Sequence, residues 1–547
     1  MPSEGTIYGH TLNDLEKVQP YNIRHPETLK PSNDTVSYSN LHPNVYNPYV
    51  DRTSTSSRSR GEGSFAPCDN PWNNSNPGEV KVFPGHLKGF PEPSVGSYEL
   101  LDIDNHIFFE KETRLGPYGY GDSVTIDWDT VNWGFVQRQC AAKNAGRYAP
   151  KDDDYQLEFT DTPSQREFLN RTAIVIRARA GTNFTENDKI NIRSLINELS
   201  LGSGGEYQVF LLIEVTNSTN IMKDEKLYRQ AVQSLVPKEF WDMTDLWSEK
   251  IIQNFYPKIP KNLTSARQSH WLALQRFSQI HSGFEYFWNW EIDSRYTGHH
   301  YDLLEKLSHF ARVQPRKGLW ERNERYYIPR IHGDYDTTFR EAVGSFIWQP
   351  PKVEGVTPLG PEPPATKDVN YVWGVGEEAD YISLSPIFNP NGTLWPDRDQ
   401  IWGYGNIPRR ATVLKQSRIS RRLLDAMHWE NLQGNQISSE MAPQTVALIH
   451  GLKAVYAPHP VFLDRGWQSE SLEKWFNPGP NGESGSHIES PFGRGKDGWL
   501  KESTWYRESE LAMKLYNNWI GMGKVGGPEV SFHNTFLFCE CVCPFLC

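Results

Sequence analysis

The sequence lacks any apolar run long enough to cross a lipid bilayer. A spanning helix needs about 20 consecutive apolar residues, and the longest runs here, 173–176 and 209–213, have only the length of strands. The first 30 residues also lack the apolar core of a secretory signal peptide. Basic residues are in the minority, 56 against 67 acidic ones, which argues against a surface dedicated to nucleic acid or anionic membranes. These absences predict a soluble, acidic, globular protein with no transmembrane segment and no nucleic-acid partner.

Cysteine is scarce, with six in 547 residues. Only Cys68 and Cys140 lie in the body of the chain, and the other four crowd the last nine positions, which does not make a disulfide scaffold. The tail cysteines suit a metal, although no paired Cys/His cluster with zinc-finger spacing accompanies them. Asn-x-Ser/Thr sequons, in contrast, exceed the number expected by chance and favour a secretory lumen. They begin at Asn33, Asn73, Asn170, Asn183, Asn217, Asn262 and Asn391.

The composition changes along the chain and predicts three parts. Residues 1–95 are rich in Pro, Asn, Ser and Tyr without sustained periodicity, as expected for a disordered stem or linker. Residues 97–530 carry the periodic segments and predict one catalytic domain, interrupted at 349–370 by a Pro-rich loop. Residues 531–547 form a Cys-rich tail.

Alternating strands and helices predict an α/β fold. The run 172–181 is apolar and ends at a glycine, 187–200 has apolar residues near helical spacing, and 207–215 is a second apolar run. Such a β-α-β unit is typical of a parallel sheet with helices on both faces. Further helices are predicted at 223–236, 244–255, 265–280, 301–312, 417–435 and 442–452, and further strands at 284–290, 379–384 and 454–456. The sequence therefore predicts a Rossmann-like fold with a mostly parallel central sheet.

Two carboxylates, Glu291 and Asp293, follow the aromatic strand 284–290. In open α/β sheets, ligands bind at the carboxyl ends of strands, and two acids two residues apart can jointly hold a divalent ion beside a diphosphate. Arg177 and Arg179 leave the first strand two residues apart, so their side chains share one face, suited to nucleotide phosphates. The alternative interpretations are a solvated turn for the acids and an exposed sheet edge for the arginines.

These segments resemble known proteins. Residues 284–293 (FEYFWNWEID) are similar to the aromatic strand and acidic metal motif of the fungal α-1,2-mannosyltransferase family. Over 97–528 the chain more closely resembles a large fungal family catalogued as a domain of unknown function, whose members look like type-A-fold glycosyltransferases. The matching blocks are 172–181, 198–207, 287–298, 404–406, 439–443 and 450–460. The resemblance implies a type-A glycosyltransferase fold and transfer of a hexose, with mannose the first choice, from a GDP- or UDP-linked donor to a hydroxyl acceptor.

The resemblance also implies a metal and nucleotide site. Glu291 and Asp293 would hold Mn²⁺ or Mg²⁺ against the pyrophosphate, with Asp293 the more direct ligand. His450 and His459 flank the last predicted strand, and His459 is the candidate for a further ligand, against a purely structural role for both. Arg295 would pair with Asp293 or contact a phosphate of the nucleotide.

The sequence also offers candidate catalytic and sugar-binding residues. Glu440 precedes Met-Ala-Pro at the start of a predicted helix, and the resemblance implies that it would bind the sugar or the acceptor or act as base or nucleophile. Its alternative is a helix N-terminal acid without chemistry. Glu430 is a further acid to test. Trp290, Trp402 and Trp429 would stack on sugar rings, against the alternative that such aromatic residues belong to the core.

The chain departs from the resembled family at both ends. Members begin with a membrane anchor that places the domain in the Golgi or endoplasmic reticulum lumen. This chain shows none, so a cytoplasmic location is the alternative to a lumenal one. The tail after 526–528 looks like an altered reading frame, a retained intron or a truncation. It leaves only His533 for the C-terminal histidine that completes the metal site in many type-A enzymes.

Other function classes remain open. The altered tail suggests a catalytically inactive carbohydrate-binding or scaffold protein, which would bind a glycan without binding a nucleotide. A glycoside hydrolase would use two carboxylates without a nucleotide or a metal, and would leave the arginine pair unexplained. A dehydrogenase is disfavoured because no Gly-x-Gly-x-x-Gly motif follows the first strand.

Overall fold

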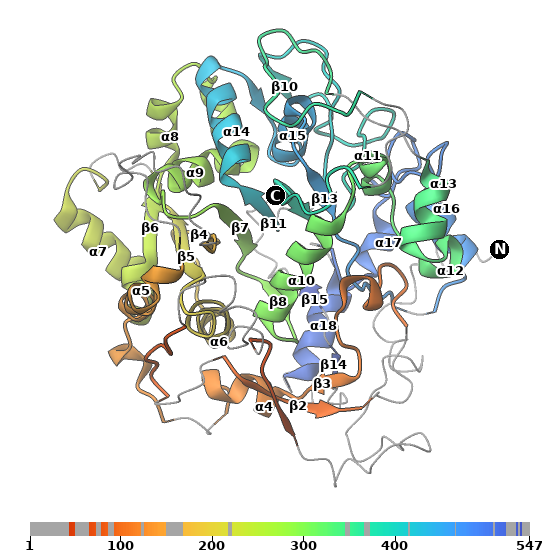
Figure 1. Ribbon diagram of the computed structural model, residues 1–547. Helices are drawn as coiled ribbons and strands as arrows, with labels where there is room; N and C mark the ends of the chain where they lie inside the picture. The colour runs from red at the N-terminus through yellow and green to blue at the C-terminus, as the bar shows by residue number, and fades with distance from the viewer. Residues whose placement is uncertain are drawn as a thin grey trace, which may run out of the picture.

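A seven-stranded sheet forms the centre of the computed structural model (Figure 1), in the order β13-β9-β11-β7-β4-β5-β6. All neighbours pair in parallel except β11, which is antiparallel to β7 and β9. The strands are β4 (Thr172–Arg179), β5 (Tyr207–Glu214), β6 (Thr244–Trp247), β7 (Tyr286–Glu291), β9 (Tyr381–Ser383), β11 (Ser417–Ser420) and β13 (Ala454–Tyr456). The structure describes residues 43–538 except 50–64, 73–77, 86–91, 122–124, 149–167, 217–220, 345–349, 366–371, 414–415, 465, 507–508, 521–531 and 534–535. The predicted α/β architecture with a mostly parallel sheet is confirmed.

Helices cover both faces of this sheet. Phe277 of α9 (Ala266–Ile280) packs edge-on against Phe287 of β7, and α14 (Arg421–Gln433) packs against both α9 and α15 (Ala442–His450). On the other face His300, the first residue of α10 (His300–Val313), contacts the ring of Trp290. Figure 1 shows α14 and α15 above the sheet and α6 (Glu186–Leu195) below it. Residues of β7 with odd numbers therefore face α9, and those with even numbers face α10, because side chains alternate along a strand.

Two short strands of the central sheet, β6 and β11, were not predicted from the sequence. The expected helix 244–255 begins instead as β6, and α8 (Glu249–Phe255) follows after Ser248 caps its first turn. The expected helix 417–435 likewise begins as β11, and Ser420 caps α14. In both places a four-residue strand lies directly before an amphipathic helix, so the helical pattern conceals it. The missed β11 is the antiparallel strand of the sheet.

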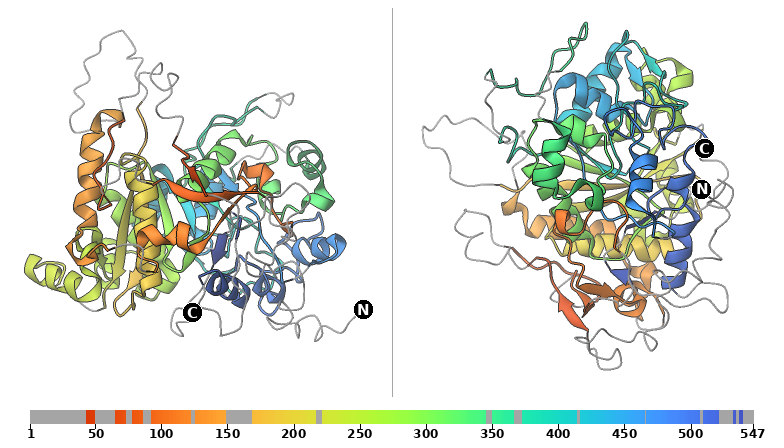
Figure 2. Two further views of the ribbon diagram at one scale, coloured as in Figure 1. Left: turned by 90° about the horizontal axis from the view of Figure 1, so that it is seen from below. Right: turned by 90° about the vertical axis from the view of Figure 1, so that its right-hand side faces the viewer.

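Parts of the expected disordered stem are ordered. Strands β1 (Asn44–Tyr46) and β2 (Val80–Pro84) form a four-stranded sheet with β3 (Ile107–Phe109) and β14 (Phe532–His533), at the end of the molecule away from α14 (Figure 2). Cys68 forms a disulfide with Cys140 of α5 (Trp133–Lys143). The sequence did not predict this bond. Residues 1–42 lie outside the described part of the chain.

The remaining elements surround the sheet. Strand β8 (Ser294–Tyr296) follows the acidic turn and pairs antiparallel with β15 (Phe536–Phe538) from the expected tail. Strands β10 (Ile401–Trp402) and β12 (Gln436–Ile437) form a second two-stranded ribbon. Shorter helices are α4 (Lys111–Leu115), α7 (Glu225–Leu235), α11 (Leu319–Asn323), α12 (Pro329–His332), α13 (Arg340–Val343), α16 (Ser469–Phe476), α17 (Gly498–Lys501) and α18 (Glu510–Trp519). No helix in the described ranges is long and apolar enough to cross a membrane.

Candidate functional site

The chain changes direction across the sheet between β4 and β7. From β4 it proceeds to β5 and β6 on one side, and then returns to place β7 on the other side of β4. In open α/β sheets this switch point is where ligands bind, outside the carboxyl ends of the two strands. Arg177 of β4 and Glu291 of β7 are register partners at these ends. The geometry therefore puts opposite charges at the position where the fold favours a ligand.

Arg177 and Glu291 form an ion pair through Nη2 and Oε1. Their side chains retain 18% and 23% of their exposure, so solvent and ligands can reach both. The Nε of Arg177 is buried and has no hydrogen-bond partner in the described part of the chain. Glu214, at the end of β5, is raised in pKa by burial and by nearby Glu249, against the lowering effect of the two strand-end arginines. The carboxyl edge of the sheet thus combines cationic and anionic groups that are only partly exposed to water.

Asp293 lies in the turn between β7 and β8 and is partly buried. Together with Glu291 it offers carboxylate oxygens, the ligands that Mg²⁺ and Mn²⁺ prefer. Among the residues that the structure describes, no group of three His, Cys, Asp or Glu side chains could hold a metal ion.

His459 does not join these acids. It follows β13, which lies three strands from β7 in the sheet, and it is 2% exposed. Its Nε2 and Nδ1 each lie 3.2 Å from a backbone carbonyl oxygen, of Leu384 and Pro460. Burial lowers the pKa of His459 to about 4, so the ring is neutral at physiological pH. The structure gives His459 a structural position rather than the expected metal position.

Arg295 has its own partner on a neighbouring helix. Its Nη2 lies 2.5 Å from Oδ1 of Asp188 in α6, and its Nη1 donates to the backbone oxygen of Ile292 over 2.6 Å. Asp188 is the third residue of α6 and forms a capping box with the N-cap residue Thr185. Arg295 therefore connects the segment after the acidic turn to the start of α6, and its expected role in phosphate binding has no support from this contact.

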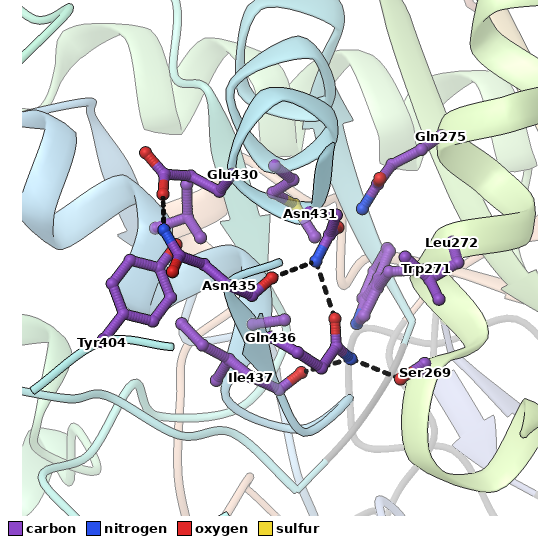
Figure 3. Close-up of a pocket in the computed structure, with 13 residues that line it drawn as sticks. Ser269, Trp271, Leu272, Gln275, Tyr404, Glu430, Asn431, Asn435, Gln436 and Ile437 are labelled. Atoms are coloured by element: carbon purple, nitrogen blue, oxygen red, sulfur yellow. Dashed lines mark hydrogen bonds between the residues drawn. The ribbon is translucent and has the colours of Figure 1, made fainter. Parts of the chain in front are cut away.

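Glu430 lies in a buried polar cluster (Figure 3). It is 3% exposed, accepts from Nδ2 of Asn435 over 2.6 Å, and has Oε1 at 3.3 Å from Nε2 of His450. Burial raises its pKa, but hydrogen bonds from His450, Asn435 and Tyr404 outweigh this and leave the pKa below its ordinary value. Glu430 is consequently an ionised, well-satisfied acid. The cluster brings together segments that are far apart in the sequence.

Glu440 is partly buried just before α15, which begins with Pro443 in its first turn as predicted. Its backbone oxygen accepts from the backbone nitrogen of Thr412 over 3.0 Å and from the side-chain amide of Gln444. The three candidate tryptophans differ in position. Trp290 is fully buried and unavailable to a sugar, whereas Trp402 and Trp429 are 55% and 60% exposed.

A pocket of about 350 Å³ lies beside Trp402. Its wall comes from three segments, and its members are mainly amides and hydroxyls: Asn262, Leu263, Gln268, Ser269, Asp399, Gln400, Ile401, Trp402, Gln436 and Ser438. Ser269 and Gln436 also line the smaller pocket that contains Glu430. Apart from Trp402, none of these side chains was proposed as a site from the sequence, because their segments carry no common local pattern. These residues come together only in the folded structure, so the sequence carried no signal for this pocket.

The fold and this edge define the class: an α/β protein whose mostly parallel sheet carries charged groups at its switch point. The chain belongs to the family described as "Protein of unknown function (DUF3405)", whose model matches residues 108–537. No curated protein matches the chain. The family match reaches into the segment 531–547 that the sequence suggested was aberrant, and it includes β14 and most of β15. Residues up to 537 therefore belong to the family domain.

We expect the stability of the protein to fall as the pH drops from 7 to 5.5. His299 and His459 are buried, and burial lowers the pKa of each from 6.5 to about 4. Below pH 6.5 these two histidines bind protons in the unfolded chain but stay neutral in the folded protein. The free energy of unfolding therefore falls by about 2 kcal/mol by pH 5.5. Urea unfolding at both pH values measures this loss. A His459→Gln variant should lose less stability over the same interval, and an identical loss would contradict the assignment.

Proposed function

We propose that this protein is a metal-dependent glycosyltransferase that moves a hexose from a nucleotide-sugar donor to a hydroxyl acceptor. The observation that carries the proposal is the partly exposed Arg177–Glu291 pair at the switch point between β4 and β7, with Asp293 two residues on. The type-A glycosyltransferase fold that the sequence resembles also has a mostly parallel sheet, and an acidic motif after an aromatic strand. Mannose, with GDP as its carrier, is the first donor to test, and UDP-linked sugars are the second.

The residues of the edge have complementary tasks in this proposal. Arg177 and Arg179 bind the donor phosphates, because guanidinium groups donate paired hydrogen bonds to phosphate oxygens. Glu291 and Asp293 hold Mn²⁺ or Mg²⁺, which supplies positive charge to the leaving diphosphate. The Arg177–Glu291 pair neutralises the two charges before the donor binds. Glu440 is the proposed base or nucleophile, and Glu430 orients Tyr404 and Asn435.

A secretory lumen is the proposed location. Disulfides persist in oxidising compartments and are rare in the cytosol, and Cys68 and Cys140 form one. Three sequons in the described part of the chain have an exposed asparagine that lies outside the pocket beside Trp402, as glycosylation requires. They are Asn170, Asn183 and Asn391.

We expect Asp293→Ala to weaken metal-dependent binding of GDP or UDP on the order of 100-fold, because one of two carboxylate ligands is lost. Isothermal titration calorimetry with each nucleotide and Mn²⁺, and then with EDTA, measures this effect. Glu225→Ala is the matched control, since Glu225 forms an exposed ion pair with Arg229 on α7, away from the edge. Binding that is insensitive to both EDTA and Asp293→Ala would refute the metal site. Absence of binding to either nucleotide would refute the transferase and favour a glycan-binding protein.

A further inference from the structure

The pocket beside Trp402 is formed at an irregular start of α9. Ser269, in the first turn of this helix, has a non-helical backbone with φ −151°. Its hydroxyl donates to the backbone oxygen of Leu263, and its Oγ accepts from the side-chain amide of Gln436. The pocket of about 350 Å³ is lined by this first turn, by the segment that precedes it and by the β10–β12 ribbon. That volume lies within the range of small-molecule sites, roughly 300–1,000 Å³.

The lining has the chemistry of a site for neutral polyhydroxyl compounds. Trp402 offers a half-exposed ring, and Gln268 and Gln400 carry partly exposed amides that both donate and accept. Asp399 is the only charged residue among those lining the pocket, and Arg398 and Arg409 pair with it over 3.3 and 3.4 Å. The pocket therefore offers no uncompensated charge to an anionic or cationic ligand.

The accessible groups of the wall suit one class of ligand. Trp402 is 55% exposed, and Gln268 and Gln400 keep partly exposed amides. We propose that this pocket binds a neutral saccharide through stacking on Trp402 and hydrogen bonds to the amides of Gln268 and Gln400. This inference rests on the proposed function, in which the saccharide is the acceptor whose hydroxyl receives the hexose.

The wall is held in place before a ligand arrives. Nδ2 of Asn431 donates to Oε1 of Gln436 over 2.7 Å, and Nε2 of Gln436 in turn donates to the hydroxyl oxygen of Ser269 (Figure 3). Gly403 follows Trp402 with φ +83°, and a Cβ there would come within 2.4 Å of Oδ1 of Asn435. Only glycine permits this close approach, so the ribbon bearing Trp402 is packed tightly onto the turn after α14. Such preorganisation reduces the entropy lost on binding.

The pocket lies on the face of the sheet to which Glu291 points. Glu291 and Phe287 are both odd-numbered residues of β7, and Phe287 packs against Phe277 of α9. The start of α9 is also held to α8, because Glu249 accepts from the backbone nitrogen of Ala266 over 3.1 Å. A saccharide in the pocket would therefore lie on the same side of the sheet as the donor site.

The test is saccharide binding by calorimetry to the wild type and three variants, with α-mannobiose, cellobiose and lactose as neutral probes and sialyllactose as the charged one. We expect a neutral probe to bind, EDTA to have no effect, and Trp402→Ala to weaken binding about tenfold. Phe135→Ala is the control, because Phe135 of α5 is an aromatic residue of similar exposure, 52%, that does not line the pocket. Gln268→Ala should also weaken binding, since Gln268 lines the pocket with a partly exposed amide.

Each outcome is decisive for the pocket and separable from the donor site. Binding that Trp402→Ala and Gln268→Ala weaken, in a protein that binds no nucleotide, upholds the saccharide pocket and refutes the transferase. Failure of all neutral probes to bind the folded wild type overturns the pocket, even when nucleotide binding succeeds. Equal effects of Trp402→Ala and Phe135→Ala, or preferential binding of sialyllactose, also overturn it.

Discussion

Replacing Glu198 with glutamine is expected to lower the free energy of unfolding by about 3–5 kcal/mol, because it removes one partner of a fully buried ion pair. Oε1 of Glu198 lies 2.6 Å from Nη1 of Arg114, and both side chains are completely inaccessible. Tyr118 donates to the same carboxylate over 2.9 Å, and the backbone nitrogen of His300 over 2.9 Å. Burial raises the pKa of Glu198, but Arg114 and the two neighbouring histidines outweigh it, and the pKa is well below its usual range. The variant leaves the Arg114 guanidinium charged and uncompensated.

Urea unfolding at pH 7 measures this loss, and Glu225→Gln provides its control. Glu225 pairs with Arg229 over 2.5 Å on the surface of α7, where both side chains are more than two-thirds exposed. Exposed pairs of this kind contribute roughly 0.2–1 kcal/mol. Equal losses for the two variants would show that Glu198 is not ionised in the folded protein, and would contradict the prediction.

The buried pair also supports the candidate active site. Arg114 donates through Nε to the backbone oxygens of Thr297 and Gly298, over 3.1 and 3.2 Å. These residues follow β8 and therefore end the segment that begins with the acidic turn. Glu198 lies in a π-helix, Ile196–Leu201, that continues α6. Insertions of this kind often occur near functional sites, and here the π-helix fixes the far end of the segment that carries Glu291 and Asp293.

The sequence predicted the part of the fold that rests on long apolar runs. Strands β4, β5 and β7 are buried on both faces, and α9 and α10 have regular helical spacing, so each element stands out in its own segment. The sequence also placed Arg177 and Glu291 at strand ends, and the structure makes them register partners on β4 and β7; their role in binding a ligand stays a prediction. Strands β6 and β11 were missed because four residues joined to a helix carry too little periodicity.

Contacts between residues far apart in the chain could not be predicted from the sequence. His459 and Glu291 are both next to predicted strands, but the order of those strands in the sheet separates them. Trp290 and Glu291 are neighbours in sequence, yet strand alternation turns the tryptophan into the core and the acid toward α9. Three segments line the pocket beside Trp402, and the first is far from the other two in the sequence: Gln268 and Gln400 are more than 130 positions apart. Contacts of that kind depend on tertiary structure alone.

Removal of the Cys68–Cys140 disulfide is expected to lower the free energy of unfolding by about 4 kcal/mol. The bond closes a loop with a sequence separation of 72 residues, and cross-linking a loop of that length removes much of the chain entropy of the unfolded state. The comparison is between the wild type and Cys68→Ala/Cys140→Ala, by urea unfolding without reductant. In addition, the wild type in dithiothreitol should approach the stability of the double variant.

Other contacts keep the two segments together once the disulfide is gone, so the double variant should fold rather than fail. Asn144 exchanges hydrogen bonds with the backbone nitrogen and oxygen of Ala66, each over 2.9 Å, and Lys143 pairs with Asp69 over 2.7 Å. The loss should therefore appear as a shift of the urea midpoint with little change in slope. An unchanged midpoint, with the disulfide present in the wild type by mass, would contradict the entropic argument. A protein made in a reducing compartment should lack the disulfide and the free energy of unfolding that it contributes. The fold is therefore most stable where thiols are oxidised.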